Sequence, residues 1–438
     1  MNAAEAKEFY LKRPEPRGPA WAAPVRQQGR ARFGALGFPT THDEDWKYTS
    51  VDPLVKLGFA PGGSADDGVD DAMAALGVDG TAANRLVFVD GRFSPGLSRL
   101  ARLPGGVIVS SLAAAMEERR EFVTLLWAQL AVVNAQSFVA LNTALAEDGA
   151  FVYVPAGTLV DEPLHLLFLA GRRDEPTNAH TRALIALGRG SQATVIESYA
   201  GVAGEPYWTN GVTEIALDDN AVLDHYKIQM ERDNAFHTAT QQARLGRGAV
   251  LTSHSFALGA ALARNDVNAR FAGEGGDCTL NGLYVPAGRQ HVDNHTRIDH
   301  DNPRCTSREL YKGILGGKSR GVFNGKIYVH EHAEKTDARQ TNRNLLLSED
   351  AWVDTKPQLE IYNNDVKCSH GSTIGQLDEN ALFFLRARGL DVRTAVELLT
   401  QGFANEITSR LRQQRVAALM EKVMAQKIGA MSAEEGRW

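Results

Sequence analysis

Cysteine is scarce in this chain of 438 residues, which holds only Cys278, Cys305 and Cys368. The three are widely spaced and odd in number, so no disulfide framework is predicted. Residues 1–10 carry charged side chains and lack the apolar stretch of a secretory signal. We therefore expect a cytoplasmic protein, in a compartment that keeps its thiols reduced.

A large excess of one charge is also lacking, since the formal net charge is -6 and the pI is about 6.1. Such a chain has no broad positive field, so we expect no nucleic-acid partner. Long hydrophobic runs are lacking as well. The most apolar stretch, 122–133, spans about 12 residues and includes Gln129, which is too short for a bilayer. We therefore expect no membrane partner.

Residues 1–148 begin with a Pro-rich arm and then mix strand and helix patterns. Alternating residues over 85–93, ending in an Asp-Gly turn, predict a hairpin strand with a partner strand over 107–109. Apolar residues at helical spacing start at Phe122 and continue to Leu145, which predicts one helical stripe. This region is therefore predicted to be an N-terminal arm with a small mixed helical domain.

Residues 149–375 consist of short alternating apolar runs that Gly, Asp and Asn interrupt. Several interruptions look alike, and the pattern repeats loosely about every 28 residues. The similar turns begin at Leu187, Leu217, Leu245, Phe271 and Leu347. This period predicts a mainly β core of stacked coils, a β-helix or related solenoid. A flat sandwich remains an alternative, because its strands also recur with regular turns.

The segment 291–300 shows how such coils would be filled, because side chains alternate between two faces of a strand. One face suits the coil interior, where Asn and β-branched side chains stack on their neighbours, and carries Val292, Asn294, Thr296, Ile298 and His300. The other face is predicted to be a solvated exterior and carries His291, Asp293, His295, Arg297 and Asp299.

Residues 376–438 return to helical spacing and predict a C-terminal helical domain. One helix is expected from the cap Asp378 to Gly389, a second from Asp391 to Gly402, and a third from Phe403 onward. Phe383 and Phe384, with Phe403, are candidates for a partner-binding face, and an internal helical core explains them equally well.

The candidate site is the pair Cys368 and His370. If this segment is a strand, the thiol and the imidazole share one face and can lean toward one soft metal centre. Two ligands are too few, because a closed site needs about four, so the others would come from elsewhere or from another chain. The plainer alternative is a small buried Cys beside an ordinary His.

A second candidate is a facial site of two histidines and a carboxylate, His291, Asp293 and His295, which would suit iron or zinc in a metal-dependent enzyme. The alternative for these three residues is a solvated polar strand. A carbohydrate-active β-helix is less favoured, because we identify no paired carboxylates on adjacent coils.

The stretch 361–375, with Asn363-Asn364-Asp365-Val366-Lys367-Cys368-Ser369-His370-Gly371, resembles the signature of the SufB/SufD family of iron–sulfur cluster assembly scaffold proteins. The resemblance spans about residues 40–430 and extends to three further segments, 291–295, 318–326 and 330–338. Two segments, 44–49 and 385–390, make it closer to the SufD branch.

The resemblance implies a right-handed parallel β-helix between an N-terminal mixed α/β region and a C-terminal helical domain. It implies pairing with a SufB-type subunit through the β-helices and binding of a SufC-type ABC ATPase by the helical domain. A cysteine desulfurase system would supply sulfur indirectly. A homodimer of the chain when alone is left open.

The resemblance also implies the role of the candidate site. His370 matches the residue tied to cluster formation, which acts with a Cys from the SufB side. Cys368 matches a neighbouring interfacial Cys, and whether it is a ligand is left open. The cofactor would be a transient iron–sulfur cluster shared with the partner, a reduced flavin in the assembled complex is left open, and the chain would not be an enzyme.

Overall fold

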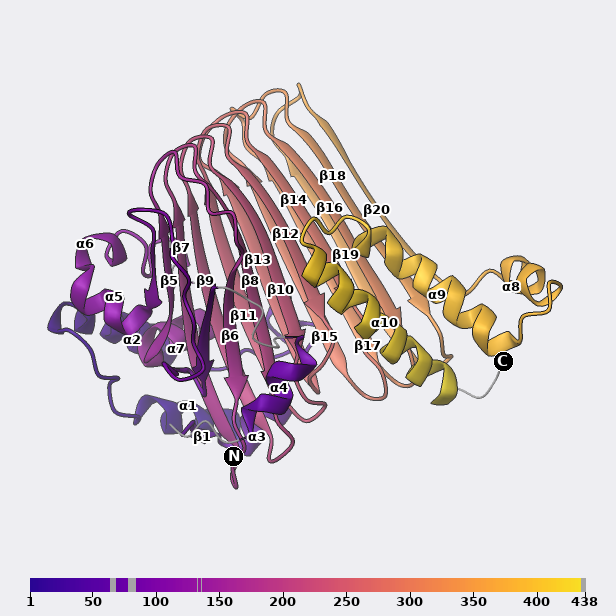
Figure 1. The fold of residues 1–438 in the computed structure, drawn as a ribbon, viewed down its shortest axis with the longest axis horizontal. Helices are drawn as coiled ribbons and strands as arrows, with labels where there is room; N and C mark the ends of the chain where they lie inside the picture. Colours follow the sequence, from indigo (N-terminus) through magenta and orange to yellow (C-terminus); the bar gives the residue numbers. More distant parts are fainter. Residues whose placement is uncertain (64–67, 78–83, 132, 135, 435–438) are drawn as a thin grey trace.

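The computed structural model describes residues 1–63, 68–77, 84–131, 133–134 and 136–434. It is mainly β, with 39% strand and 25% helix, and its core consists of two ten-stranded sheets. From residue 148 to residue 375, successive strands alternate between the two sheets, so the backbone winds as a β-solenoid of about eight turns (Figure 1). The stacked-coil prediction is confirmed, and the sandwich alternative is wrong.

We call the two layers sheet A and sheet B. Sheet A contains, in spatial order, β19 (Trp352–Ile361), β17 (Arg320–Val329), β15 (His291–His300), β13 (Leu262–Phe271), β11 (Phe236–Leu245), β9 (Tyr207–Leu217), β7 (Thr177–Leu187), β5 (Asp148–Val154) and β4 (Ile108–Ser111), with β1 (Ala60–Pro61) beside β7. Sheet B contains β20 (Lys367–Gly375), β18 (Asp337–Leu346), β16 (Thr306–Leu315), β14 (Asp277–Tyr284), β12 (Val250–Ala257), β10 (Val222–Met230), β8 (Gln192–Gly201), β6 (Leu164–Ala170), β2 (Asn84–Val89) and β3 (Arg92–Phe93).

Four of the five similar turns seen in the sequence form one corner of the solenoid. Leu187, Leu217, Leu245 and Phe271 are register partners on neighbouring parallel strands, and each ends a strand of sheet A. The turn after Leu347 lies at another corner, since it leads from β18 in sheet B to β19 in sheet A. The loose period therefore corresponds to one coil.

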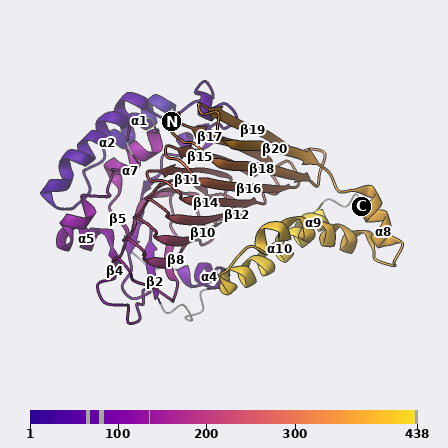
Figure 2. The same cartoon turned by 90° about the horizontal axis from the view of Figure 1, so that it is seen from above.

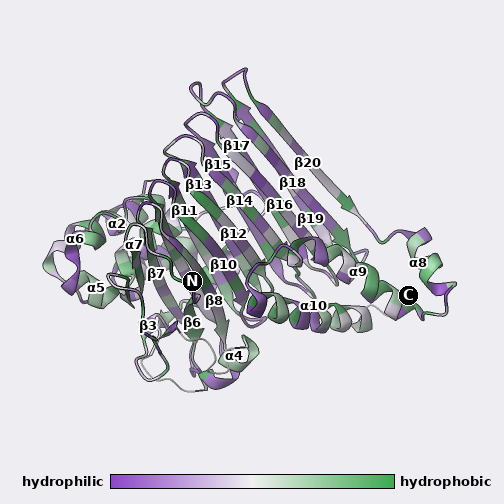
Figure 3. Ribbon diagram, turned by 45° about the horizontal axis from the view of Figure 1, so that its top comes forward, coloured by the Kyte–Doolittle hydropathy of each residue, from purple (hydrophilic) through white to green (hydrophobic). Residues whose placement is uncertain are grey.

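The coil interior is filled as predicted for β15. Its five inward side chains are all buried, and the amides of Asn265 and Asn294 meet across neighbouring strands at 3.3 Å. Hydrophilic and hydrophobic residues accordingly alternate along many strands (Figure 3). The opposite face of β15 is not simply solvated, because Asp293 is only 1% exposed beneath the N-terminal arm.

Helices of the N-terminal region cover the outer face of sheet A, while α4 (Val69–Ala75) packs on sheet B (Figure 2). The helices on sheet A are α1 (Ala3–Leu11), α2 (Ala23–Leu36), α3 (Asp52–Leu57), α5 (Leu112–Glu118), α6 (Arg120–Val123) and α7 (Ser137–Leu145), with short 3-10 turns at Ala20–Ala22 and Glu44–Trp46. Trp46 anchors the arm, because its ring lies 5.3 Å from that of Phe138 and stacks under Arg264 at 4.3 Å.

Two local predictions in this region are wrong. The Asp90-Gly91 turn does form a hairpin, because both residues adopt the positive φ that such a turn requires. However, β4 pairs with β5, and β2 instead joins sheet B beside β6. The predicted helical stripe is interrupted, since α6 ends at Val123 and Ala128 has a φ of 59°. Positions 132 and 135 of that stripe lie outside the described residues.

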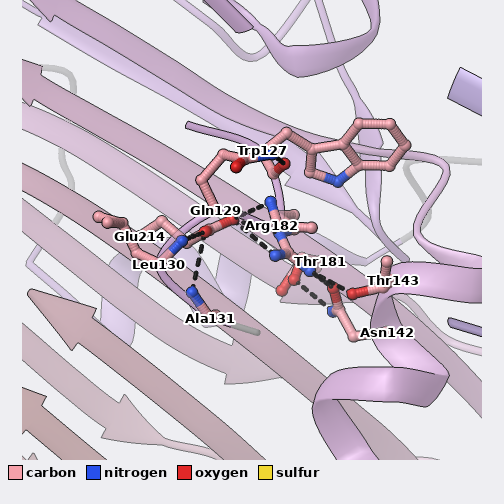
Figure 4. A network of polar contacts seen from close by, with 10 residues as sticks. Trp127, Gln129, Leu130, Ala131, Asn142, Thr143, Thr181, Arg182 and Glu214 are labelled. Carbon is pink, nitrogen blue, oxygen red and sulfur yellow. Dashed lines mark hydrogen bonds and ion pairs between the residues drawn. The ribbon is translucent and has the colours of Figure 1, made fainter. Parts of the chain in front are cut away.

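A buried polar network fixes this interrupted segment to sheet A (Figure 4). The Arg182 guanidinium contacts Glu214 at 2.6 Å and donates to the side chains of Asn142 and Thr143 on α7. Glu214 in turn accepts the backbone N–H groups of three residues in the loop, Ala128, Leu130 and Ala131. Sequence analysis did not predict this network, because its members are far apart in the chain.

The C-terminal helices are α8 (Glu379–Arg386), α9 (Val392–Thr408) and α10 (Gln414–Glu434). The caps Asp378 and Asp391 are confirmed, since each accepts a backbone N–H at its helix start. The predicted end at Gly402 is wrong, because α9 continues through that position. Both α9 and α10 lie along sheet B, whereas α8 projects away from the solenoid (Figures 1 and 2).

Candidate metal centre

The solenoid ends in an open coil. β19 and β20 are the last strands of sheets A and B, and no further strand in the described ranges pairs with them. Their backbone edge is therefore unpaired, as in any terminal strand. Exposed apolar side chains border this open end, namely Trp352, Ile361, Tyr362 and Ile374.

Cys368 and His370 lie on β20, where they continue two interior columns of the solenoid. Cys368 is in register with Ala338, and His370 is in register with Gln340. Ala338 and Gln340 point inward and are buried, so the two β20 side chains also lie on the inward face. Because no coil follows, His370 is exposed at the open end and Cys368 is half-buried.

The Cys368 thiol packs in an apolar cluster with Ile327, Leu359 and Val366. Burial is the main cause that raises its pKa, and Asp337 adds to the effect. The thiol therefore remains protonated in the isolated chain and must lose its proton before it can bind a metal. This environment disfavours the thiolate form of Cys368.

Cys278 and Cys305 are buried elsewhere in the core, and burial raises the pKa of both thiols. In the part of the chain that the structure describes, no group of three or more His, Cys, Asp or Glu side chains could hold a metal ion. The open end thus presents one exposed imidazole and one half-buried thiol, which is half of the donor set that a closed site needs.

The alternative facial site is not formed, because its donors already have protein partners. The Thr49 hydroxyl contacts His291 Nε2 at 2.9 Å and donates to Asp293 at 2.5 Å. Arg264 donates to the same Asp293 oxygen at 2.6 Å, and His295 lies 3.2 Å from the other oxygen. Burial opposes ionisation of Asp293, yet Arg264 and then His295 outweigh it and hold its pKa well below the usual range. These residues clamp the N-terminal arm onto sheet A.

Sequence analysis missed two buried residues beside the candidate site, Gln340 and Glu309. Gln340 Nε2 donates to Glu309 Oε2 at 2.8 Å, inside the coil that precedes His370. Neither residue belongs to a local motif. The coil period was the available signal, since it places positions 309, 340 and 370 in one column.

Fold and site together define an open-ended β-solenoid whose last coil presents a thiol and an imidazole on its inward face. Two family models match the chain: "SUF system FeS cluster assembly, SufBD core domain" over residues 168–403 and "SufBD protein N-terminal region" over residues 19–166. The chain belongs to the SufB/SufD family of the iron–sulfur cluster assembly system.

Similar proteins carry matching names. The chain is 35% identical to the iron–sulfur cluster assembly protein SufD of Escherichia coli over 406 residues, 92% of each chain. It is 34% identical to a SufBD family protein of Synechocystis over 396 residues, 88% of this chain and 87% of the relative. Identity to SufD of Bacillus subtilis is 26% over 437 residues, 96% of this chain and 97% of the relative. The described helices include none that is both long and apolar enough to cross a membrane.

Proposed function

We propose that this chain is a non-catalytic scaffold subunit that builds and releases nascent iron–sulfur clusters together with a SufB-type subunit and SufC-type ABC ATPases. One observation carries the proposal. His370 continues an interior column of the solenoid and is nevertheless exposed, because its coil is the last one. A second protein that covers this end would meet the imidazole directly.

The cluster is the cargo, and His370 is its ligand from this chain. Cys368 is a second candidate ligand, which becomes available once a partner or a metal displaces the thiol proton. The remaining ligands are thiolates of the SufB-type subunit. A cluster held across an interface is labile, since opening the interface removes ligands, and such lability suits a protein that passes its cargo on.

The SufB-type partner would add its own coils to the open end. The unpaired edges of β19 and β20 offer backbone hydrogen bonds to further strands, and exposed Ile361, Tyr362 and Ile374 offer apolar contact. The same edge would let two copies of this chain form a symmetric homodimer when no partner is present.

The helical region 376–438 is the proposed docking site for the ATPase subunit. Two phenylalanines of α8 support this assignment, because Phe383 is 74% and Phe384 54% exposed on a helix that projects from the solenoid. Phe403 is not part of this docking site, because its ring packs on sheet B beneath Lys312. ATP binding by this ATPase would move the two scaffold subunits relative to each other. A cysteine desulfurase system would supply the sulfur. The proposed compartment is the reducing cytoplasm.

The test is cluster formation by the complete complex that carries His370→Ala. We expect the complex to assemble at its normal size and the cluster yield, followed by visible absorbance, to fall at least about tenfold. Ser372→Ala is the matched control, because Ser372 is an exposed residue two positions along the same face of β20. A normal cluster yield from the assembled His370→Ala complex would refute the assignment of the site.

A further inference from the structure

Three polar side chains form one column on the inward face of the last three strands of sheet B. Glu309 of β16 is in register with Gln340 of β18, which is in register with His370 of β20. Glu309 and Gln340 are 3% and 1% exposed. Neighbouring strands lie about 4.8 Å apart, so each side chain in the column can reach the next.

The Gln340 amide is satisfied on one side only. Its Nε2 donates to Glu309 in the preceding coil, whereas its Oε1 is buried and has no hydrogen-bond partner in the described structure. Leaving a buried amide oxygen without a donor is unfavourable, so a donor that reaches this oxygen is stabilised there. Because the two ends of an amide diverge, an Nε2 directed at Glu309 leaves Oε1 on the side away from Glu309.

Sheet A leaves room for this amide at Gly325. A Cβ added at Gly325 would overlap Gln340 Nε2 and lie 2.7 Å from both Gln340 Cδ and Phe323 Cζ. The φ of Gly325 is not in the left-handed region, so the glycine is needed there for space and not for backbone conformation. The amide is thus held between Glu309 on one side and the bare backbone of β17 on the other.

No hydrogen bond joins Gln340 Oε1 and His370 in the described structure, where the imidazole is exposed at the open end. A protein that covers the open end would confine the ring to the interior column, next to the unsatisfied oxygen. A histidine that binds a metal through one ring nitrogen usually donates its other ring N–H to an oxygen of the protein, which fixes the tautomer and the ring orientation.

We propose that Gln340 is a positioning residue for His370. When the open end is covered, Gln340 Oε1 accepts one ring N–H of His370, so that the unprotonated nitrogen faces the cluster iron. Glu309 acts through Gln340 by holding its amide in the required orientation. This inference rests on the proposed function, because it takes His370 as the cluster ligand.

The test compares variants of the complete complex with the SufB-type and SufC-type subunits. Gln340→Met removes the acceptor at similar length, and Gly325→Ala displaces the amide without changing Gln340. For both we expect roughly a tenfold loss of cluster yield. We also expect a changed hyperfine coupling of the ring nitrogen remote from iron, measured with ¹⁵N-histidine in this chain. Arg339→Met is the control, since Arg339 lies next to Gln340 on the outward face of the same strand.

The double variant Glu309→Gln with Gln340→Glu separates positioning from packing. In this variant the amide at position 309 donates to the carboxylate at position 340, and the second carboxylate oxygen remains an acceptor for His370. We therefore expect cluster yield and coupling to return to within about twofold of wild type. The inference would be overturned if the double variant failed to restore cluster yield and coupling. It would also be overturned if Gln340→Met kept the wild-type yield and coupling. If His370→Ala itself forms clusters normally, the assignment of His370 as the cluster ligand fails. If only His370→Ala is impaired, the ligand assignment stands and the positioning role of Gln340 fails.

Discussion

Arg182 and Glu214 form an ion pair whose side chains are both fully buried, and their nearest atoms are 2.6 Å apart. The two partners are not equivalent. Glu214 also accepts three backbone N–H groups from the loop after α6, whereas Arg182 depends on Glu214 and two side chains of α7. Loss of the carboxylate therefore leaves more buried groups unsatisfied than loss of the guanidinium.

We accordingly expect Glu214→Ala to lower the free energy of unfolding by about 3–5 kcal/mol, because it leaves a buried cation without a partner. Arg182→Met should cost less, since backbone donors still satisfy the carboxylate. Urea denaturation of both variants measures the difference. Equal losses, or a larger loss for Arg182→Met, would show that the backbone contacts of Glu214 contribute little.

Glu309 predicts a pH dependence of stability. Burial raises its pKa to about 7 in the folded chain, against about 4.3 for an unperturbed glutamate. The stability that the neutral carboxyl contributes is therefore complete below about pH 4.3 and is lost as the pH rises through about 7. Glu309→Gln lacks this loss, so its unfolding free energy relative to wild type should rise by up to about 3 kcal/mol between pH 4.5 and pH 8. Urea denaturation across this range checks the slope, and a constant difference would contradict the assignment.

The thiols predict an order of reactivity. Since burial raises the pKa of Cys368 in the isolated chain, iodoacetamide should modify it several-fold more slowly than a free thiol at pH 7. Cys278 and Cys305 should react only after unfolding, because both are buried. Mass spectrometry with Cys368→Ser as the reference assigns the label. Faster modification of Cys368 than of a free thiol would mean that the chain stabilises a thiolate there.

The two phenylalanines of α8 predict a loss of binding without a loss of folding. Phe383→Ala with Phe384→Ala should weaken co-purification of the SufC-type ATPase, since both rings are exposed in the free chain. The free energy of unfolding of the double variant should differ from that of wild type by no more than about 0.5 kcal/mol. Leu125→Ala is the matched control, because Leu125 is 73% exposed but lies in the N-terminal region. Normal ATPase binding by the double variant would place the docking surface elsewhere.

The β core was predictable because one coil repeats about every 28 residues and because strand faces alternate, as Val292 and Ile298 show. Helix ends were less predictable. Gly402 predicted a helix end, but α9 packs on sheet B and continues through this position. At Ala128 the helical pattern is interrupted, and the backbone N–H of Ala128 instead donates to Glu214. Tertiary contacts outweigh local propensity in both cases.

For the site, the sequence indicated Cys368 and His370 and their shared face, and the register agrees with that placement. The sequence also indicated that the core ends near residue 375, so that this segment forms its last strand. What could not be read from the sequence is the register, which places His370 beside buried Gln340 while His370 itself is exposed. The Gln340 and Glu309 contacts were equally hidden, because they join strands about 30 residues apart in the chain.

The most direct test of the account is electron–nuclear double resonance on the cluster-loaded complex, with ¹⁵N-histidine incorporated only into this chain. We predict a strong coupling from one directly bound imidazole nitrogen, present in wild type and in Ser372→Ala and absent in His370→Ala. A cluster that shows no nitrogen coupling in wild type, or the same coupling in His370→Ala, would contradict the assignment of His370 as a ligand.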